Sequence, residues 1–594
     1  MGYIIFTLTI CCVYLRPFRL PIWVFSTLGA VCAYALDVVS LSDIALVWEI
    51  TKPSTLALIG LILLSLSFEK LGFFTHLASC ITPHTHFIQT WKFFVLLIIL
   101  GSVVSIVFAN DGAVLVLTPL ILALFDKRNS SLTQSLNEHG NSASGTTKEV
   151  ASSPRFVQHS CGSEATKSQR ANLTQDTRIY ESNDTNSQTN TESNGTESNK
   201  PKIPNLPNKD NESGAVSLSY FWSFWRQGAG SYLSGSDQAE HEHSAKSAKK
   251  TSHLTLVIVF LLVISFVSDF ASNALVISNL TNIITAQMFG MDFVRFALTM
   301  ALPQIFGLLA FVGIAWLCFR RFLPRTLCFA TESKRESSLD SNAQFSFTCD
   351  KEHDCPLSKH TFAHKPTKLT LLLCYVLVIA LLGGIVVGER YGAELYVFLF
   401  GASFIALAYA WALGLFQPRT LFRETPFSVV VFSFGLFVVV FGVKNAGFLE
   451  SMREVFESIE SAPLFVQIFS VGVFSSLGSS VINNLPMVLL GNLTIESFSL
   501  DSAHQNVLAL AHLLGCNIGS KLTPIGSLAT LLFLLKLKIS GIKIPLLTYL
   551  AFAFVITFCV LFTSLLGLWV SVLRSVGSVG SVGSAPQNLA QSLC

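Results

Sequence analysis

Long apolar stretches, separated by short polar ones, dominate this chain. Segments such as 92–109, 296–319 and 544–573 are apolar over most of their length, and a helix that crosses a bilayer needs about 20 such residues. Of the 594 residues, 51% are hydrophobic and 13% are charged, whereas an ordinary soluble domain carries about 25% charged residues. We therefore predict an all-α, polytopic membrane protein of about 10–12 transmembrane helices.

Two polar segments interrupt the apolar pattern. Residues 126–250 are rich in Ser, Thr and Asn and hold few apolar residues, a composition that cannot bury enough surface to fold. The second segment follows Arg320 and Arg321, which predicts a cytoplasmic location for this end. The predicted organisation is membrane repeat 1 at 1–125 and 251–321, a disordered insert at 126–250, a polar loop at 322–367, membrane repeat 2 at 368–574 and a flexible tail at 575–594.

One polar motif occurs once in each half of the chain. The segment 108–119, FANDGAVLVLTP, aligns without gaps on 481–492, VINNLPMVLLGN. This alignment places Asn110 on Asn483. Both copies interrupt an apolar run with asparagine next to a helix-breaking glycine or proline.

A second motif repeats in the same way. The segment 269–284, DFASNALVISNLTNII, aligns on 517–532, NIGSKLTPIGSLATLL, so that Asp269 falls on Asn517. Removing the insert 126–250 makes the distance between the two motifs equal in both halves. The sequence therefore predicts a duplicated membrane unit that carries an insertion in its first copy.

The composition of these motifs predicts where the polar site lies. Unwound backbone survives in hydrocarbon only where it lines a cavity enclosed by protein. Two pairs of broken helices or re-entrant hairpins, related by the repeat, are the arrangement of an alternating-access transporter with its site near the midplane. The alternative is that the Asn and Ser side chains only join helices by hydrogen bonds.

At these residues the chain resembles the arsenical pump membrane protein family, the bacterial arsenite efflux permeases of the ion transporter superfamily. The resemblance covers both halves outside the two polar segments. It implies export of arsenite and antimonite across the bacterial inner membrane, driven by protons or by a separate soluble ATPase. Two features depart from the family pattern, namely the long insert and Asn517, where some members have an acidic residue. The strings that carry the resemblance are VFANDGAVLVLTP at 107–119, VISNLTNI at 276–283, VINNLPMVLLGNLTI at 481–495 and LLGCNIGSKLTPIGSLATLLFL at 513–534.

Arsenite is mostly an uncharged trihydroxide at neutral pH, so its site needs amide and hydroxyl groups rather than a strong counter-charge. Trivalent arsenic also prefers sulfur, which adds one thiol to the candidates; that cysteine is equally a small packing residue. The candidate substrate-binding residues are Asn110, Ser272, Ser278, Asn279, Asn282, Asn483, Asn484, Cys516, Asn517, Ser520, Thr523 and Ser527.

Proton coupling needs a group that titrates within the membrane. An ionisable residue in a membrane segment is costly and is by default a functional hypothesis. Asp111 and Asp269 are the acids inside the motifs of the first half, and we expect them to carry the proton. The alternative for either acid is a salt bridge, for example to Lys521 or Lys444.

Other functions remain as alternatives. A sodium- or proton-coupled carboxylate or sulfate transporter would use the same fold, and Lys521 inside a motif suits an anion. A membrane scaffold or sensor would have no need of the matched motifs. The chain has no P-loop and no paired acid and base, so we expect no enzyme activity. We also expect no cofactor, metal or nucleic-acid partner, since the thirteen cysteines form no C-x-x-C pair and the net charge is only +3.

Overall fold

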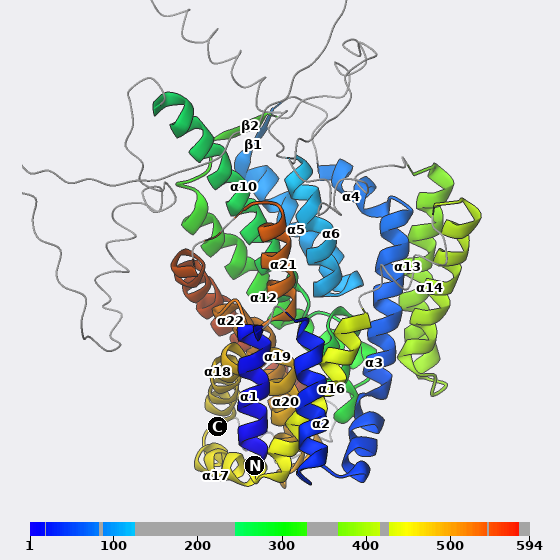
Figure 1. Ribbon diagram of the computed structural model, residues 1–594, viewed down its shortest axis with the longest axis vertical. Helices are drawn as coiled ribbons and strands as arrows, with labels where there is room; N and C mark the ends of the chain where they lie inside the picture. Colours follow the sequence, from blue (N-terminus) through cyan, green and yellow to red (C-terminus); the bar gives the residue numbers. More distant parts are fainter. Residues whose placement is uncertain are drawn as a thin grey trace, which may run out of the picture. The chain divides into compact units, whose positions relative to one another are not determined.

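The computed structural model describes residues 1–17, 20–81, 87–124, 244–328, 366–415, 427–542, 544 and 546–580. They all belong to one compact unit, formed by Met1–Asn137 and Phe221–Cys594. This part of the chain is almost entirely helical (Figure 1), which confirms the predicted all-α fold. Most of the insert 126–250, of the loop 322–367 and of the tail 575–594 lies outside the described residues.

The first half contains two regions of membrane helices joined across the insert. Its elements are α1 (Gly2–Leu15), α2 (Ile22–Ala35), α3 (Leu41–Lys70), α4 (Phe73–Ile81), β1 (Phe87–Gln89), α5 (Thr90–Phe108), α6 (Asn110–Leu124), α10 (Ser244–Ala271), the short 3-10 helix η3 (Val276–Ser278), α11 (Leu280–Met288), α12 (Phe293–Phe319) and β2 (Thr326–Cys328).

The second half follows the same order of long helices and interrupted ones. Its elements are α13 (Lys368–Glu389), α14 (Leu395–Ala412), α16 (Phe427–Asn445), α17 (Phe448–Glu460), α18 (Leu464–Ile482), α19 (Asn484–Glu496), α20 (Ser502–Gly519), the 3-10 helix η5 (Ser520–Leu522), α21 (Leu528–Ile539) and α22 (Leu546–Gly580).

Eight of the described helices are long and apolar enough to cross a membrane, and three shorter apolar helices accompany them. By contrast, the helices that follow the breaks, α6, α19 and α21, have 15, 13 and 12 residues. Such lengths are too short for a full crossing. They fit the prediction of helices that enter the membrane only partway.

Three local features differ from the sequence-based expectation. The strands β1 and β2 pair antiparallel, with Phe87 opposite Cys328; strands of three residues carry too little periodicity to be predicted. Helix α10 begins at Ser244, inside the predicted insert, and α22 continues to Gly580, inside the predicted tail. In both cases a polar stretch extends an apolar helix that is already nucleated.

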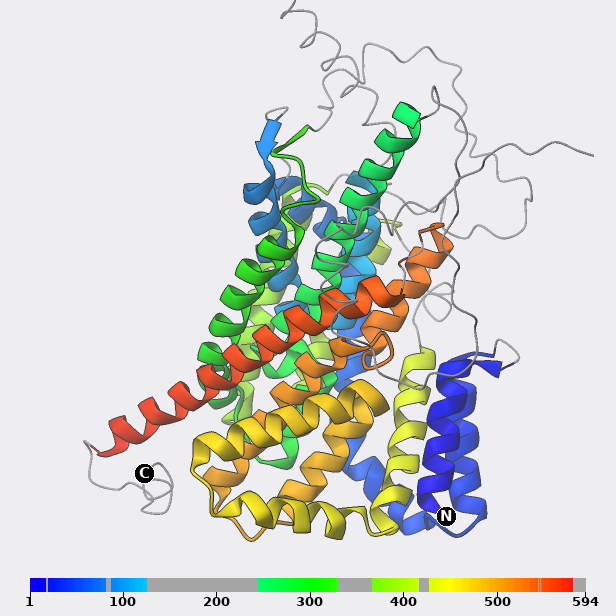
Figure 2. The same ribbon diagram turned by 90° about the vertical axis from the view of Figure 1, so that its left-hand side faces the viewer.

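The long helices pack in pairs around the interrupted ones. Helix α12 packs along α22, α18 along α20, and α5 along α10. Figure 2 shows α22, in red, crossing the green α12 obliquely. In Figure 1, α5, α6 and α10 lie toward the end with the two strands, whereas α18, α19 and α20 lie toward the end with α17.

Both predicted helix breaks of the first motif are present. Helix α5 passes to α6 through Ala109, with φ 64° and ψ 159°. Helix α18 passes to α19 through Asn483, with φ 83° and ψ 152°. Two non-glycine residues thus adopt the same rare conformation at matched places, and such conformations cluster at functional sites.

Matched hydrogen bonds fix the register of the repeat. The Ser105 hydroxyl donates to the backbone carbonyl of Ser268, and the Ser479 hydroxyl donates to that of Cys516. The helix ends agree with the predicted alignment of the second motif, since α10 ends at Ala271 and α20 at Gly519. Applied to the first motif, the same contacts pair Ser105 with Ser479.

The predicted pairing of Asn110 with Asn483 is therefore wrong by one residue. Helix α6 begins at Asn110 and α19 begins at Asn484, so these two asparagines are equivalent. Asn483 is instead the partner of Ala109. The error arose because two adjacent asparagines make the alignment of the short string ambiguous.

Candidate functional site

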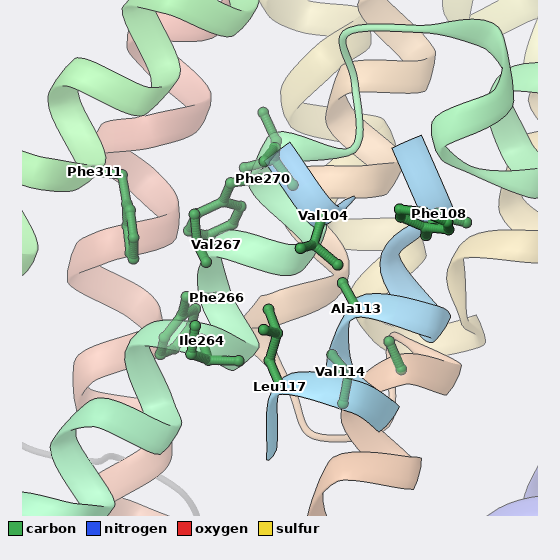
Figure 3. Packing of buried hydrophobic residues seen from close by; sticks show 14 of the residues in the cluster. Val104, Phe108, Ala113, Val114, Leu117, Ile264, Phe266, Val267, Phe270 and Phe311 are labelled. Atoms are coloured by element: carbon green, nitrogen blue, oxygen red, sulfur yellow. The ribbon is translucent and has the colours of Figure 1, made fainter. Parts of the chain in front are cut away.

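Tight apolar packing holds the break between α5 and α6 in place. Val104 of α5, Ala113 of α6 and Val267 of α10 are buried in one cluster, and Figure 3 shows their side chains directed toward the space between these helices. Phe108, the last residue of α5, packs edge-on against Phe68 of α3. The position of the break is thus set by side chains on three neighbouring helices.

A pocket lies where the four interrupted segments meet. Asn110 and Asn484 are the first residues of α6 and α19, and Asn279 and Ser527 immediately precede α11 and α21. These four residues form two repeat-related pairs. The pocket is lined by Leu58, Asn110, Asn279, Leu280, Val429, Ser433, Asn484, Leu485 and Ser527.

The pocket contains polar atoms that the described protein leaves unsatisfied. Asn484 Oδ1 and Ser527 Oγ are buried and have no hydrogen-bond partner among the described residues. A buried polar atom without a partner costs about 1–3 kcal/mol. Such atoms in a pocket are consistent with a ligand that supplies the missing hydrogen bonds.

The electrostatic character of the pocket comes from backbone rather than from charged side chains. Four helix N-termini converge on it, and each carries a partial positive charge from its aligned peptide dipoles. None of the described lining residues is ionisable. The polar groups of the pocket are thus the amides of three asparagines, the hydroxyls of two serines and the helix N-termini.

An ion pair lies beside the pocket. Lys521 Nζ is 2.9 Å from Asp269 Oδ2, and the two side chains are 0% and 2% exposed. The ammonium also donates to Ser265 Oγ over 3.1 Å and to Thr530 Oγ1 over 2.6 Å. On the pocket side, Asn110 Nδ2 donates to Asp269 Oδ1 over 3.0 Å.

The other copy of the repeat has a neutral contact in the equivalent place. Asn517 corresponds to Asp269, and Asn273 corresponds to Lys521. Asn517 Nδ2 donates to Asn273 Oδ1 over 2.8 Å and to Asn282 Oδ1 over 3.0 Å, while Thr281 Oγ1 donates to Asn517 Oδ1 over 2.7 Å. One of the two contacts between the breaks is therefore an ion pair, and its counterpart is built from amides.

Ten of the twelve predicted substrate-binding residues divide into two groups. Asn110, Asn279, Asn484 and Ser527 line the pocket. Most of the others hold the unwound segments together through backbone carbonyls, so that their side chains stabilise the breaks. These hydrogen bonds run from Ser272 to Asp269, from Ser278 to Ile106, from Asn282 to Ser272 and Leu275, from Asn483 to Ile525, from Ser520 to Asn517 and from Thr523 to Ser480.

Two of the predicted functional residues are placed differently from these groups. Cys516 is buried between α18 and α20, where its Sγ lies 3.8 Å from His512 Nδ1 and 3.9 Å from the carbonyl oxygen of Ser475. It is not among the residues that line the pocket, and its role as a ligand stays a prediction. The backbone of Asp111 is part of α6, but its side chain lies outside what the structure describes.

Sequence reasoning missed part of the pocket wall. Leu58 of α3 and the residues Val429 and Ser433 of α16 belong to long apolar helices without a motif. Ser433 is one of two serines in the run FSVVVFSFGLF, and its polarity is the one local signal at this position. Leu280 and Leu485 lie inside the motifs but were passed over because they are apolar.

The comparisons with known proteins agree over nearly the whole chain. A family model described as Arsenical pump membrane protein matches residues 1–160 and 248–572. An arsenical pump membrane protein of Escherichia coli is 25% identical over 564 residues, which cover 95% of this chain and 97% of the relative. Proteins of the same description from Escherichia coli strain K12 and Yersinia enterocolitica are 24% identical over 568 residues, with the same coverage.

Proposed function

The chain belongs to the arsenical pump membrane protein family, and on this premise we propose that it exports arsenite and antimonite through the pocket between its two repeats. Its relatives are bacterial, and eight of its described helices are apolar and long enough to span a bilayer. It is a multi-pass protein of the bacterial inner membrane. The substrate and the energy source are the proposed part.

One observation carries the choice of substrate. The pocket offers amide and hydroxyl groups from both repeats, and two of their oxygen atoms, Asn484 Oδ1 and Ser527 Oγ, have no partner among the described residues. The uncharged trihydroxides of trivalent arsenic and antimony carry both O–H donors and oxygen acceptors. They can satisfy an amide oxygen and a hydroxyl at the same time.

The ion pair argues against the alternative of an organic or inorganic anion. An anion site benefits from a cation, and Lys521 is the cation within the motifs. Its ammonium is bound to Asp269, Ser265 and Thr530 and is not among the pocket-lining groups. The partial charges of the helix N-termini are the positive potential that remains for a substrate.

We further propose that protons drive this export, with Asp269 and Asp111 as the coupling acids. Asp269 lies next to the pocket and contacts it through Asn110. A buried carboxylate is the kind of group that carries protons in transporters. A soluble ATPase that drives the pump from outside is the alternative source of energy.

The test is arsenite tolerance and intracellular arsenic in a bacterial host without its own efflux system. We would compare the parent chain, the Asp111→Asn, Asp269→Asn double variant and the empty vector, at matched amounts of membrane-inserted protein. Lower arsenic with the parent, lost in the double variant, supports proton-coupled export. Export retained in the variant keeps the substrate but contradicts the coupling residues.

A parent that behaves like the empty vector would contradict arsenite export altogether. Uptake of labelled sulfate and carboxylates would then be measured in the same strains. Stimulation of export only when a soluble ATPase is co-expressed would assign the energy source to that partner. Antimonite is tested in parallel, because the same trihydroxide chemistry predicts that it is exported with the same dependence on the two acids.

A further inference from the structure

Asn110 joins the pocket to the Asp269–Lys521 ion pair. Its side chain lines the pocket, and its Nδ2 donates a 3.0 Å hydrogen bond to Asp269 Oδ1. Both residues are buried, with Asn110 4% and Asp269 1% exposed. A change at the carboxylate is therefore transmitted to the pocket through a single amide group.

The orientation of an amide side chain depends on whether a neighbouring carboxyl group holds a proton. The side chain of Asn110 has a donor at one end and an acceptor at the other. An ionised carboxylate only accepts, so it holds Nδ2 toward Asp269 and directs the amide oxygen elsewhere. A proton on Asp269 Oδ1 turns that atom into a donor, which requires the opposite end of the amide.

The groups around Asp269 come from several helices. The described ionisable side chains that interact with it are Lys521 of η5, paired with its other oxygen, and Tyr549 of α22. Lys521 also donates to two hydroxyls. Asp111 of α6 follows Asn110 in the sequence, and its side chain lies outside what the structure describes. The other described side chains that neighbouring helices present to this region are neutral: Ser105 from α5, Gln304 from α12, Asn517 from α20 and Thr530 from α21.

We propose that Asn110 makes proton binding and substrate binding mutually exclusive, an inference that rests on the proposed export of arsenite. With Asp269 ionised, the amide oxygen of Asn110 accepts a hydrogen bond from a hydroxyl of the substrate. When Asp269 takes up a proton from solvent, the amide reverses and this acceptor is withdrawn. Exclusive binding is what an exchanger requires, because a carrier that held both ligands would move them in the same direction.

The repeat supplies a matched control. Asn484 is equivalent to Asn110, lines the same pocket and begins the equivalent helix. The residue equivalent to Asp269 is Asn517, which cannot take up a proton. Replacing either asparagine removes one hydrogen bond to the substrate, but only Asn110 contacts a residue that can take up a proton, Asp269.

The experiment measures arsenite uptake into everted inner-membrane vesicles at a series of pH values on both sides of neutrality. We would compare the parent chain with Asn110→Leu and Asn484→Leu at equal amounts of inserted protein. Loss of one hydrogen bond raises the half-saturating arsenite concentration on the order of tenfold in either variant. In the parent and in Asn484→Leu this concentration falls as the pH rises, whereas in Asn110→Leu it is the same at every pH.

Equal pH dependence in the two variants would overturn the role of Asn110. A parent that takes up no arsenite contradicts the proposed function instead, so the two failures are distinguishable. If Asn110→Leu is not inserted at the parental level, Asn110→Ser takes its place. A hydroxyl can donate or accept by rotation, so it does not report the proton, and the same flat profile is expected.

Discussion

The two contacts between the helix breaks of the second motif are related by the repeat but differ in charge. One is the buried ion pair of Asp269 in the first repeat with Lys521 in the second. The equivalent contact joins Asn517 in the second repeat to Asn273 in the first by a neutral hydrogen bond. Both contacts connect one repeat to the other, so the symmetry of the scaffold is kept while only one of the two contacts holds groups that ionise.

This difference indicates a division of labour between the two contacts. An amide pair fixes geometry without responding to pH, whereas a carboxylate can take up a proton. The pocket is lined by equivalent residues of both copies, and the charged contact reaches it through Asn110. Each prediction below alters one of these two contacts and compares the result with a control or with the other contact.

The largest effect is expected when the charged pair loses one member. Lys521→Met leaves the Asp269 carboxylate buried without its cation, and breaking a buried pair in this way costs about 3–5 kcal/mol. We expect a severe loss of folded protein, measured as the fraction that stays monodisperse after heating in detergent. Transport is expected to fall with it.

The matched control for this prediction is Lys538→Met. Lys538 is an exposed lysine in the last turn of α21, close in sequence to the site but not part of the pair. The same change there should be nearly neutral, since exposed charges contribute little to stability. If the two variants were equally sensitive to heat, the ion pair would not stabilise the folded protein.

An intermediate effect is expected when both contacts are made neutral. The double variant Asp269→Asn, Lys521→Asn puts an amide contact like that of Asn517 with Asn273 in place of the ion pair. Replacing both members of a buried pair is often close to neutral for stability, so folding should recover relative to Lys521→Met. Arsenite should then equilibrate across everted vesicles without being concentrated by an imposed pH gradient.

The double variant separates stability from coupling. A chain that folds well and still concentrates arsenite with the pH gradient would show that Asp269 does not carry the proton, and Asp111 would be the remaining acid of the motifs. A chain that does not fold would show that an amide contact like that of Asn517 with Asn273 needs more than two asparagines. The amount of each variant inserted in the membrane is measured first, so that a loss of folding is distinguished from a loss of coupling.

The breaks themselves were predictable because their chemistry is local. Asn combined with Gly or Pro inside an apolar run favours a helix break, and the helix ends at Ala271 and Gly519 agree with the predicted alignment. The register of the first motif was not predictable from its letters, because Asn483 and Asn484 align equally well with Asn110. Hydrogen bonds between helices decide between these two alignments, and the sequence does not show such bonds.

The pocket wall was the least predictable part of the site. Val429 and Ser433 line it because α16 packs against α19, and packing between helices distant in sequence leaves no local pattern. The contact of Asp269 with Lys521 could be suggested as an alternative, but the equivalence with Asn517 and Asn273 became visible only when both contacts were placed side by side. Functional and structural asparagines look the same in a sequence.

The smallest effect is expected at the neutral contact of Asn517 with Asn273. Asn273→Ala removes one acceptor from Asn517, which keeps its hydrogen bonds to Asn282 and Thr281. The loss of one neutral hydrogen bond should cost about 1 kcal/mol, seen as a small drop in thermal stability beside Lys521→Met. The pH dependence of arsenite uptake should equal that of the parent, because no titrating group has changed. If Asn273→Ala is as damaging as Lys521→Met, charge is not what distinguishes the two contacts. If it shifts the pH dependence, the neutral contact takes part in coupling, and the division of labour between the two contacts is wrong.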